Sequence, residues 1–333
     1  MSTTLTSELT RPVFQPLPLL GNPHVQTFLG AYLPGPSLQA KQMHIVRLAD
    51  GDALLVHENC PTSWQAGDPI ALILHGLGGS ASSPHVQRMA YALQAHGVRV
   101  ARLDLRGAGQ GIALARGFYH GGRSDDIRAV LQTLHEWSPL SPLLLVGLSL
   151  GGNLALRVAG ELHQHPVANL TRVAALSPPI DLERCQALLA SPANRVYEDM
   201  FVRIVVSEAR QRQRLFPDLP PLRLPPGRIG FRTFDELYTA PRCGFADAID
   251  YYRKASPQRL IPHIPIPALI ITSRDDPFIA IEPFESLRLP DHIQLHIVPA
   301  GGHIGFVGWD RTGGVRWAER WIVDWLLQER LAA

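Results

Sequence analysis

The most constraining feature of this sequence is a short apolar run that passes directly into a serine between glycines. Leu143 to Gly147 is typical of a buried strand, and Leu148-Ser149-Leu150-Gly151-Gly152 follows it and opens a segment of helical periodicity. A serine at so sharp a strand-to-helix turn is held in strained backbone geometry, and glycine two residues before and after it lets neighbouring segments approach closely. The turn is therefore expected to lift the Ser149 hydroxyl above the sheet.

Two backbone amides near this serine are candidate oxyanion donors. The amide of Leu150 stands at the start of the predicted helix, where an N–H group can point at developing negative charge. A glycine-rich turn, His75-Gly76-Leu77-Gly78-Gly79, follows the third strand, from which hydrolases with this type of serine turn draw their second donor. We assign that role to the amide of Leu77, and we interpret the His75 ring as a structural part of the turn.

Later turns carry a candidate acid and a candidate base. His303 follows the last predicted strand in Gly301-Gly302-His303, and we expect it to be the base. Ser273-Arg274-Asp275-Asp276-Pro277 follows the seventh strand, and Asp276 is preferred as the orienting acid because it directly precedes the proline-containing turn. Asp275 remains an alternative. The chain order of serine, acid and histidine is that of a Ser-His-Asp triad after strands five, seven and eight of an α/β-hydrolase.

The rest of the chain alternates short aliphatic runs with helical segments, which is typical of a largely parallel sheet with crossover helices. The predicted strands are Met43–Leu48, Ala53–His57, Ile70–His75, Val98–Leu103, Leu143–Gly147, Val173–Leu176, Ala268–Thr272 and Ile293–Val298. The predicted helices of the core are His85–Ala95, Ser124–Trp137, Leu150–His163 and Val315–Leu331. In the last of these, Trp317, Trp321 and Trp325 share one face, which indicates core packing.

These patterns predict the α/β-hydrolase fold, with a mostly parallel eight-stranded sheet, flanking helices and an inserted helical cap. Residues 1–40 are expected to form an irregular arm, residues 41–180 and 266–333 the two parts of the core, and residues 181–265 the cap. The insert is too long for a loop and contains a helical stretch around Tyr197–Arg214. Apolar side chains that could line an acyl pocket, or anchor the insert, are Leu188, Leu189, Phe201, Ile204 and Val205.

Composition narrows the class of protein. The net charge is +2, from 31 basic and 29 acidic side chains, which disfavours nucleic acid as a partner. Cys60, Cys185 and Cys243 lack the paired spacings of a zinc site or a disulfide framework. The sequence has neither a signal-peptide pattern nor an apolar run long enough to span a membrane. We expect a cytoplasmic enzyme without a metal or other cofactor; peripheral membrane contact and the oligomeric state are open.

Motifs along most of the chain resemble the YheT-like branch of the α/β-hydrolases, which includes bacterial proteins described as esterases, mammalian membrane-anchored lipases and yeast ethyl-ester synthases. The resemblance rests on Gly21–Thr27, His75–Pro84, the serine turn ending in Asn153, Phe234-Asp235, Thr239-Ala240-Pro241, Gly244-Phe245, Asp250-Tyr251-Tyr252, Asp275–Phe278 and Gly301–His303. It implies hydrolysis of carboxylic esters, of short or medium acyl chain length. Asp104–Gly107 and Gly117–Gly122 also resemble this branch, and their arginine and histidine are expected to form buried structural hydrogen bonds.

The sequence thus predicts a serine esterase that acts on a small-molecule ester through Ser149, His303 and Asp276, with Leu77 and Leu150 as oxyanion donors. Serine at the nucleophile position disfavours haloalkane dehalogenase and epoxide hydrolase chemistry, which need a carboxylate. Two alternatives are an acyltransferase, in which an alcohol takes the acyl group from the serine, and a non-catalytic binding protein on the same fold. Loss of a triad residue, expected of the latter, is not seen.

Overall fold

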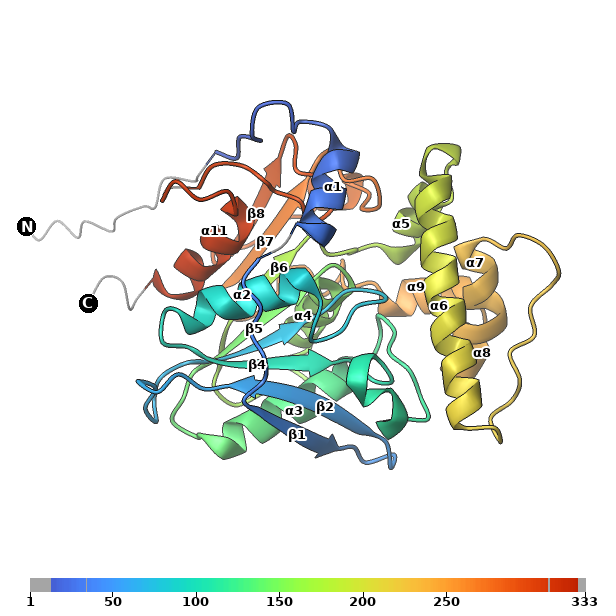
Figure 1. The fold of residues 1–333 in the computed structure, drawn as a ribbon, viewed down its shortest axis with the longest axis horizontal. Coiled ribbons are helices and arrows are strands. Elements are labelled where there is room, and N and C mark those ends of the chain that lie inside the picture. Colours follow the sequence, from blue (N-terminus) through green and yellow to red (C-terminus); the bar gives the residue numbers. More distant parts are fainter. Residues whose placement is uncertain (1–12, 34, 311, 329–333) are drawn as a thin grey trace, which may run out of the picture.

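A single eight-stranded sheet forms the centre of the computed structural model, which describes residues 13–33, 35–310 and 312–328 (Figure 1). Its spatial order is β1-β2-β4-β3-β5-β6-β7-β8, and all strand pairs are parallel except β1–β2 and β2–β4. The strands are β1 Gln42–Arg47, β2 Ala53–Asn59, β3 Ile70–Leu74, β4 Arg99–Asp104, β5 Leu143–Leu148, β6 Leu170–Leu176, β7 Ala268–Ser273 and β8 Ile293–Val298.

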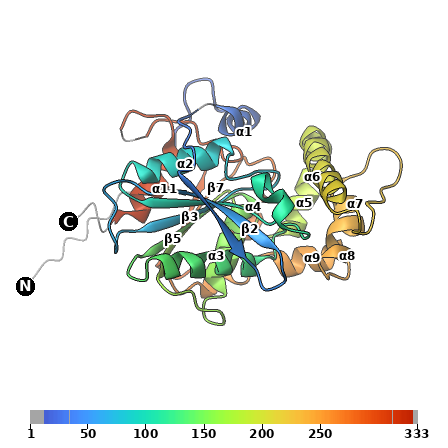
Figure 2. The same ribbon diagram turned by 60° about the horizontal axis from the view of Figure 1, so that its bottom comes forward.

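Both faces of the sheet are covered, and the central strands β3 and β5 are accordingly buried at every position and contain no polar side chain. Along β3, Ile70, Leu72 and Leu74 join one hydrophobic cluster, whereas Ala71 and Ile73 join the other. Helices α2 (Pro84–Gln94) and α11 (Trp317–Leu326) pack on the second cluster, and α3 (Ser124–Trp137) and α4 (Leu150–Gly160) pack on the first. The sheet is thus the middle layer of three (Figure 2).

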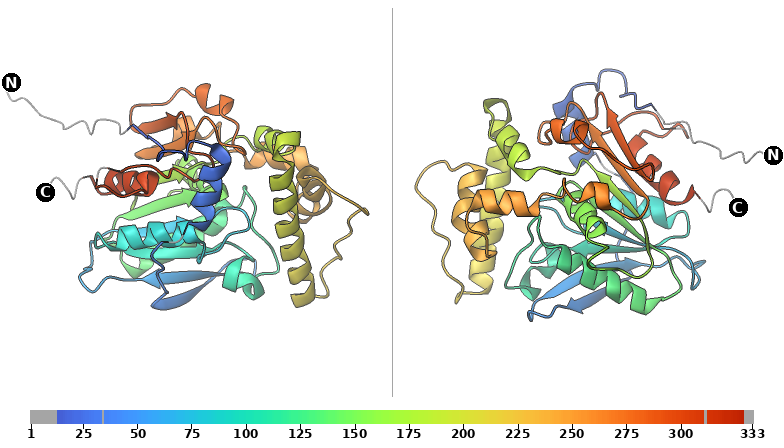
Figure 3. Two further views of the ribbon diagram at one scale, coloured as in Figure 1. Left: turned by 45° about the horizontal axis from the view of Figure 1, so that its top comes forward. Right: turned by 180° about the vertical axis from the view of Figure 1, so that it is seen from behind.

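The segment between β6 and β7 is helical and stands beside the sheet (Figure 3). It comprises α5 (Leu182–Leu189), a 3₁₀ turn (Pro192–Asn194), α6 (Arg195–Leu215), α7 (Phe231–Phe234), one π-helical turn (Asp235–Thr239), α8 (Ala240–Arg242) and α9 (Ala248–Ala255). Its own small core includes Val202, Val206, Ala209, Phe234 and Tyr238. The helical character expected of the insert is therefore present.

Three short elements lie in the connections between the strands and helices of the core. They are the 3₁₀ turns Gly109–Leu114 and Ile261–His263 and the short helix α10 (Glu282–Glu285). The predicted strands and helices correspond to observed ones within a few residues, and the tryptophan face of α11 is buried as core packing. The end predicted for α11, at residue 331, lies outside the described residues.

One expectation about the N-terminal arm is wrong. Residues 1–40 were expected to be irregular, but Pro23–Tyr32 form helix α1, which lies beside the core. Asn22 caps this helix by accepting hydrogen bonds from the amides of His24 and Val25, and Pro23 stands in its first turn.

Among the described residues, every helix is too short or too polar to span a lipid bilayer.

Candidate active site

Ser149 lies on the predicted turn between β5 and α4, in a conformation that is rare outside glycine. Its φ is 52° and its ψ is −120°. A Cβ at Gly147 would lie 2.2 Å from the Gly151 carbonyl oxygen, and one at Gly151 would lie 2.5 Å from that of Leu74. Larger residues at 147 and 151 would therefore collide with backbone, so both glycines are required for the chain to pack this closely around the serine.

The structure brings Ser149, His303 and Asp276 together. The Oγ atom of Ser149 lies 2.9 Å from Nε2 of His303, and Nδ1 of His303 lies 2.8 Å from Oδ2 of Asp276. Because the carboxylate accepts the Nδ1 proton, Nε2 is left as an acceptor for the serine hydroxyl. This is the arrangement in which a histidine can take a proton from a serine.

The two adjacent acids contact the same loop in different ways. Asp276 is 5% exposed, and its Oδ1 accepts hydrogen bonds from the amides of Phe278 and Ile279, which leaves Oδ2 for the His303 ring. Asp275 instead accepts from the amide of Gly302 through Oδ1, at 3.0 Å. The geometry therefore favours Asp276 as the partner of the His303 ring. Asp275 instead holds the backbone of Gly302, the residue directly before His303.

Helix α1 holds the His303 loop from the other side. The amide of His303 donates to Oγ1 of Thr27 over 2.9 Å, and the buried side chain of Gln26 both accepts from the Val307 amide and donates to its carbonyl. A Cβ at Gly302 would lie 2.3 Å from the carbonyl oxygen of Pro23. The arm motif noted in the sequence therefore packs against the loop that carries the candidate base.

Residues 75–79, which carry the candidate oxyanion donor Leu77 and are named the oxyanion turn for that reason, lie against the serine. A Cβ at Gly76 would stand 3.0 Å from that of Ser149. The buried ring of His75 accepts a hydrogen bond from the Leu105 amide at Nε2, so its Nδ1 carries the proton and donates it to the Gly76 carbonyl over 2.7 Å. Burial lowers the pKa of His75, which keeps the ring neutral and suited to the expected structural role.

A pocket of about 110 Å³ opens over the serine and histidine. Leu77 and Leu150, the two expected oxyanion donors, are both part of its wall. The insert contributes Leu182, Cys185, Gln186, Leu189, Phe201, Phe231, Asp235, Tyr251 and Tyr252, and the core adds Pro179, Phe278 and Ile279. The wall is therefore mainly apolar, as expected of a site for an acyl group.

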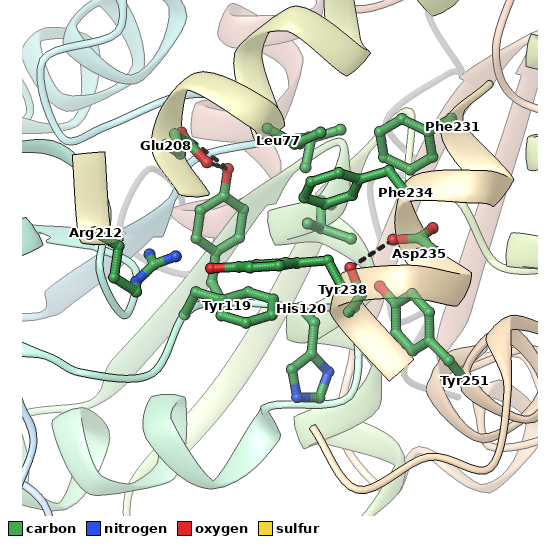
Figure 4. A pocket seen from close by; sticks show the side chains of 14 residues that line it. Leu77, Tyr119, His120, Glu208, Arg212, Phe231, Phe234, Asp235, Tyr238 and Tyr251 are labelled. Carbon is green, nitrogen blue, oxygen red and sulfur yellow. Dashed lines mark hydrogen bonds between the residues drawn. The ribbon is translucent and has the colours of Figure 1, made fainter. Parts of the chain in front are cut away.

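A second, narrower cavity of about 40 Å³ adjoins this pocket (Figure 4). The two share Leu77, Leu150, Phe231, Asp235 and Tyr251. Its other walls carry polar groups, among them Tyr119, His120, Glu208, Arg212 and Tyr238. The space beyond the oxyanion turn is thus more polar than the pocket above Ser149.

Comparisons with known proteins agree with this architecture. The profile of the alpha/beta hydrolase fold family matches residues 69–308. "Putative esterase YheT" of Escherichia coli (strain K12) is 32% identical over 94% of this chain and 92% of its own. The chain belongs to the YheT branch of the α/β-hydrolase family.

More distant relatives have other activities in their names. "Phospholipase ABHD3" of Bos taurus is 26% identical over 85% of this chain and 70% of its own, and "Medium-chain fatty acid ethyl ester synthase/esterase 2" of Saccharomyces cerevisiae is 28% identical over 77% and 61%. Among solved structures, Est1E from Butyrivibrio proteoclasticus with bound ferulic acid superposes with a TM-score of 0.55 at 16% identity, covering 87% of this chain and all of that one. That likeness concerns the α/β-hydrolase fold alone.

Of the five insert residues expected either to line an acyl pocket or to anchor the insert, Leu189 and Phe201 line the pocket over Ser149, and Val205 lines the second cavity. Leu188 and Ile204 line neither space. Ile204 lines neither space because its side chain lies against Gly78: a Cβ added at Gly78 would stand 2.6 Å from Cγ2 of Ile204. Its side chain packs on the oxyanion turn.

Sequence reasoning missed Asp235 as a residue of the pocket wall. Its carboxyl accepts hydrogen bonds from Thr239 and Tyr252, and burial raises its pKa to about 6. It belongs to the π-helical turn, an irregularity that is frequent at functional sites. The Phe234-Asp235 motif was noted only as part of a resemblance, and nothing in its spacing indicated that it faces the pocket.

The two other family-like motifs have the structural roles expected of them. Arg106 is buried and forms ion pairs with Asp126, Asp52 and Asp50. The ring of His120 is buried and accepts a hydrogen bond from the amide of Gly122. Within the described residues, neither Arg106 nor His120 forms a hydrogen bond or ion pair with Ser149.

Proposed function

We propose that this protein is a serine carboxylic-ester hydrolase in which Ser149, His303 and Asp276 form the catalytic triad. The observation that carries the proposal is the continuous hydrogen-bond chain from the Ser149 hydroxyl through both ring nitrogens of His303 to a buried carboxylate. Such a chain activates a hydroxyl that is otherwise a weak nucleophile.

The mechanism follows from these contacts. Nε2 of His303 accepts the hydroxyl proton as Oγ attacks the ester carbonyl, and Asp276 stabilises the imidazolium that forms. The amides of Leu77 and Leu150 donate to the oxyanion of the tetrahedral intermediate. His303 then gives its proton to the leaving alcohol, and water, deprotonated by the same ring, resolves the acyl-enzyme.

We propose short or medium acyl chains as substrates, held under residues 181–265 as a cap. The support is the mainly apolar wall that this insert contributes to a pocket of about 110 Å³. The yeast relative whose name includes medium-chain fatty acid esters agrees with that size range. Phe201 and Leu189, which line the pocket, would contact the acyl chain.

Alcohol acyltransfer is the second candidate, and the name of the yeast ethyl ester synthase/esterase favours keeping it. The same acyl-enzyme would serve both reactions, since they differ only in whether water or an alcohol attacks it. Adding ethanol during hydrolysis of a p-nitrophenyl ester separates them. Appearance of the ethyl ester in place of the free acid would assign the acyltransferase activity.

The decisive experiment for the proposed function combines a fluorophosphonate probe with p-nitrophenyl esters of increasing chain length. The wild type should be labelled at Ser149, and Ser149→Ala should lose labelling while kcat falls by on the order of 10⁶, as in other triad enzymes. Circular dichroism should show an intact fold in the variant. Full labelling of the variant, at another serine, would overturn the assignment.

A further inference from the structure

We propose that Tyr119 and Glu208 act together as positioning residues for the oxyanion turn, linking helix α6 of the insert to the peptide that follows Leu77. The inference rests on the proposed function, because it assigns a task to residues around the oxyanion donor of that reaction. Neither side chain belongs to the triad or lines the pocket over Ser149.

Tyr119 bonds directly to the oxyanion turn. The amide of Gly78 donates to the Tyr119 hydroxyl oxygen over 2.7 Å. The hydroxyl in turn donates its one proton to the Glu208 carboxyl, whose oxygens Oε2 and Oε1 lie 3.1 and 3.4 Å away. Figure 4 shows the two side chains end to end beside Leu77. Because a phenol has one proton, a Glu208 oxygen that accepts it leaves the hydroxyl oxygen free to accept from the turn. Burial raises the pKa of Glu208 to about 7, and the carboxyl retains an acceptor oxygen in either protonation state.

This contact completes a pair of restraints on the two peptide units that flank Leu77. The Gly76 carbonyl and the Leu77 amide belong to one planar peptide unit, so the hydrogen bond from His75 to that carbonyl also fixes the direction of the Leu77 N–H. The next unit contains the Gly78 amide, which Tyr119 holds. Gly78 has a φ of +68°, and glycine keeps little preference for that conformation by itself. The turn is closed internally by a hydrogen bond from the Gly79 amide to the Gly76 carbonyl over 3.1 Å, and Tyr119 supplies the partner of the Gly78 amide.

The pair lies between the core and the insert, with Tyr119 buried and Glu208 partly buried. Tyr119 is 6% exposed, and burial raises its pKa well above the usual value, so it remains a protonated phenol. Ile204, one turn before Glu208 on α6, packs on Gly78 itself. Arg212, one turn after it, donates to the Gly107 carbonyl and lies over the Phe118 ring. Helix α6 thus contacts the oxyanion turn through apolar packing and through a hydrogen-bond chain.

The test measures steady-state kinetics of a p-nitrophenyl ester. Tyr119→Phe leaves the Gly78 amide without its partner, and we expect kcat to fall about tenfold with KM within twofold of the wild type. Glu208→Leu should lose as much. Glu208→Gln should stay within threefold, because its amide oxygen still accepts from the phenol. The double variant Tyr119→Phe/Glu208→Leu should be no slower than either single variant, since all three break one chain.

A transition-state mimic distinguishes positioning from general destabilisation. A trifluoromethyl ketone binds the serine as a tetrahedral oxyanion, so its affinity should fall by the same factor as kcat/KM in Tyr119→Phe. The product carboxylic acid should bind as it does to the wild type. Tyr238→Phe is the matched control, since Tyr238 is buried in the same second cavity without a bond to the turn, and its kcat should be unchanged.

Three results would overturn the pairing: an unchanged kcat in Tyr119→Phe, a change confined to KM, or losses that multiply in the double variant. Should Glu208→Leu fail to fold, Tyr119→Phe and Glu208→Gln still decide the matter. Wild-type protein that hydrolyses no ester and reacts with no fluorophosphonate would instead refute the proposed function. An active wild type with a fully active Tyr119→Phe would refute the positioning pair alone.

Discussion

Asp275 and Asp276 are adjacent in the chain and contact neighbouring residues of one loop, but only one of them contacts the ring of the proposed base. Asp276 takes the proton-bearing nitrogen of the His303 ring, whereas Asp275 takes the backbone amide of Gly302. The first contact sets the tautomer of the proposed base. The second sets only the path of the chain that carries it.

We expect Asp276→Asn to lower kcat by on the order of 10⁴, the loss seen when the orienting acid of a serine protease is made an amide. The amide can present its NH₂ group to Nδ1, which moves the ring proton to Nε2 and removes the acceptor that Ser149 needs. Asp275→Asn should stay within about threefold of the wild type, because its oxygen can still accept from Gly302. Steady-state kinetics with matched melting temperatures measures both, and the opposite ranking would move the acid to Asp275.

The sequence could name the residues that carry the proposed reaction but could not rank the two acids by contact. Ser149 and His303 stand out because each lies in a glycine-containing turn directly after an apolar strand. Asp275 and Asp276 follow one strand in the same turn, and the position of Asp276 directly before Pro277 favours it without removing Asp275 as an alternative. Their difference is the direction in which each carboxyl points, which depends on the amides of Phe278 and Ile279.

At the scale of elements, the way α1 packs explains why the sequence did not predict this helix. Its polar Gln26 and Thr27 face inward to the His303 loop, while Phe28 and Tyr32 are 61% and 62% exposed. An amphipathic helix is usually recognised in a sequence because its apolar side chains face the core, and in α1 the polar side chains do so instead. The helix is stabilised by hydrogen bonds to a loop far away in the chain, and local periodicity does not report such contacts.

The proposed role of the insert in substrate choice can be tested at Phe201. Phe201 lines the pocket over Ser149 and packs edge-on against Phe278, which in turn contacts the His303 ring. Phe201→Ala should open space for more methylene groups and shift kcat/KM toward longer acyl chains, with each methylene of discrimination worth about 1–3 kcal/mol. Relative kcat/KM across p-nitrophenyl esters from two to twelve carbons, about the range an apolar pocket of this type could span, measures the shift.

Phe234→Ala is the control for that measurement. Phe234 is equally aromatic, belongs to the same insert and is 3% exposed, but it does not line the pocket over Ser149. Its loss should lower the melting temperature, by a cavity cost of about 3–5 kcal/mol, with the chain-length profile unchanged. If Phe201→Ala behaved in the same way, the proposed acyl contact of Phe201 would be wrong.

At the scale of the whole molecule, the core follows from local patterns and the junction between core and insert does not. The central strands β3 and β5 are apolar along their length, as in Ile70–Leu74, so their positions are predictable from the sequence. Tyr119 and Glu208 lie 89 residues apart, and their contact arises only when α6 packs beside the oxyanion turn. Nothing in the spacing of either residue indicates the other.

Burial also sets how the folded chain responds to acid. His120 is 7% exposed, accepts the Gly122 amide at Nδ1 and has aromatic rings of Phe245 and Tyr251 edge-on to it. Burial, with a smaller contribution from nearby arginines, lowers its pKa from 6.5 to about 3. Between these values the unfolded chain binds a proton at this position and the folded chain does not, so the free energy of unfolding falls as the pH falls below 6.5.

The last prediction therefore compares the acid sensitivity of two variants. From pH 6.5 to pH 5, this one residue should cost wild-type stability on the order of 1–2 kcal/mol, since one pKa unit corresponds to about 1.36 kcal/mol. His120→Asn keeps an oxygen near the Nδ1 position for the Gly122 amide and cannot take up the proton. Its stability should start lower, because the smaller side chain leaves space, but should fall less steeply with acid. His263→Asn, at an exposed site, should follow the wild-type slope. Urea denaturation at half-unit pH steps gives each slope, and equal slopes for His120→Asn and the wild type would mean that the buried ring takes up its proton in the folded state as readily as in the unfolded one.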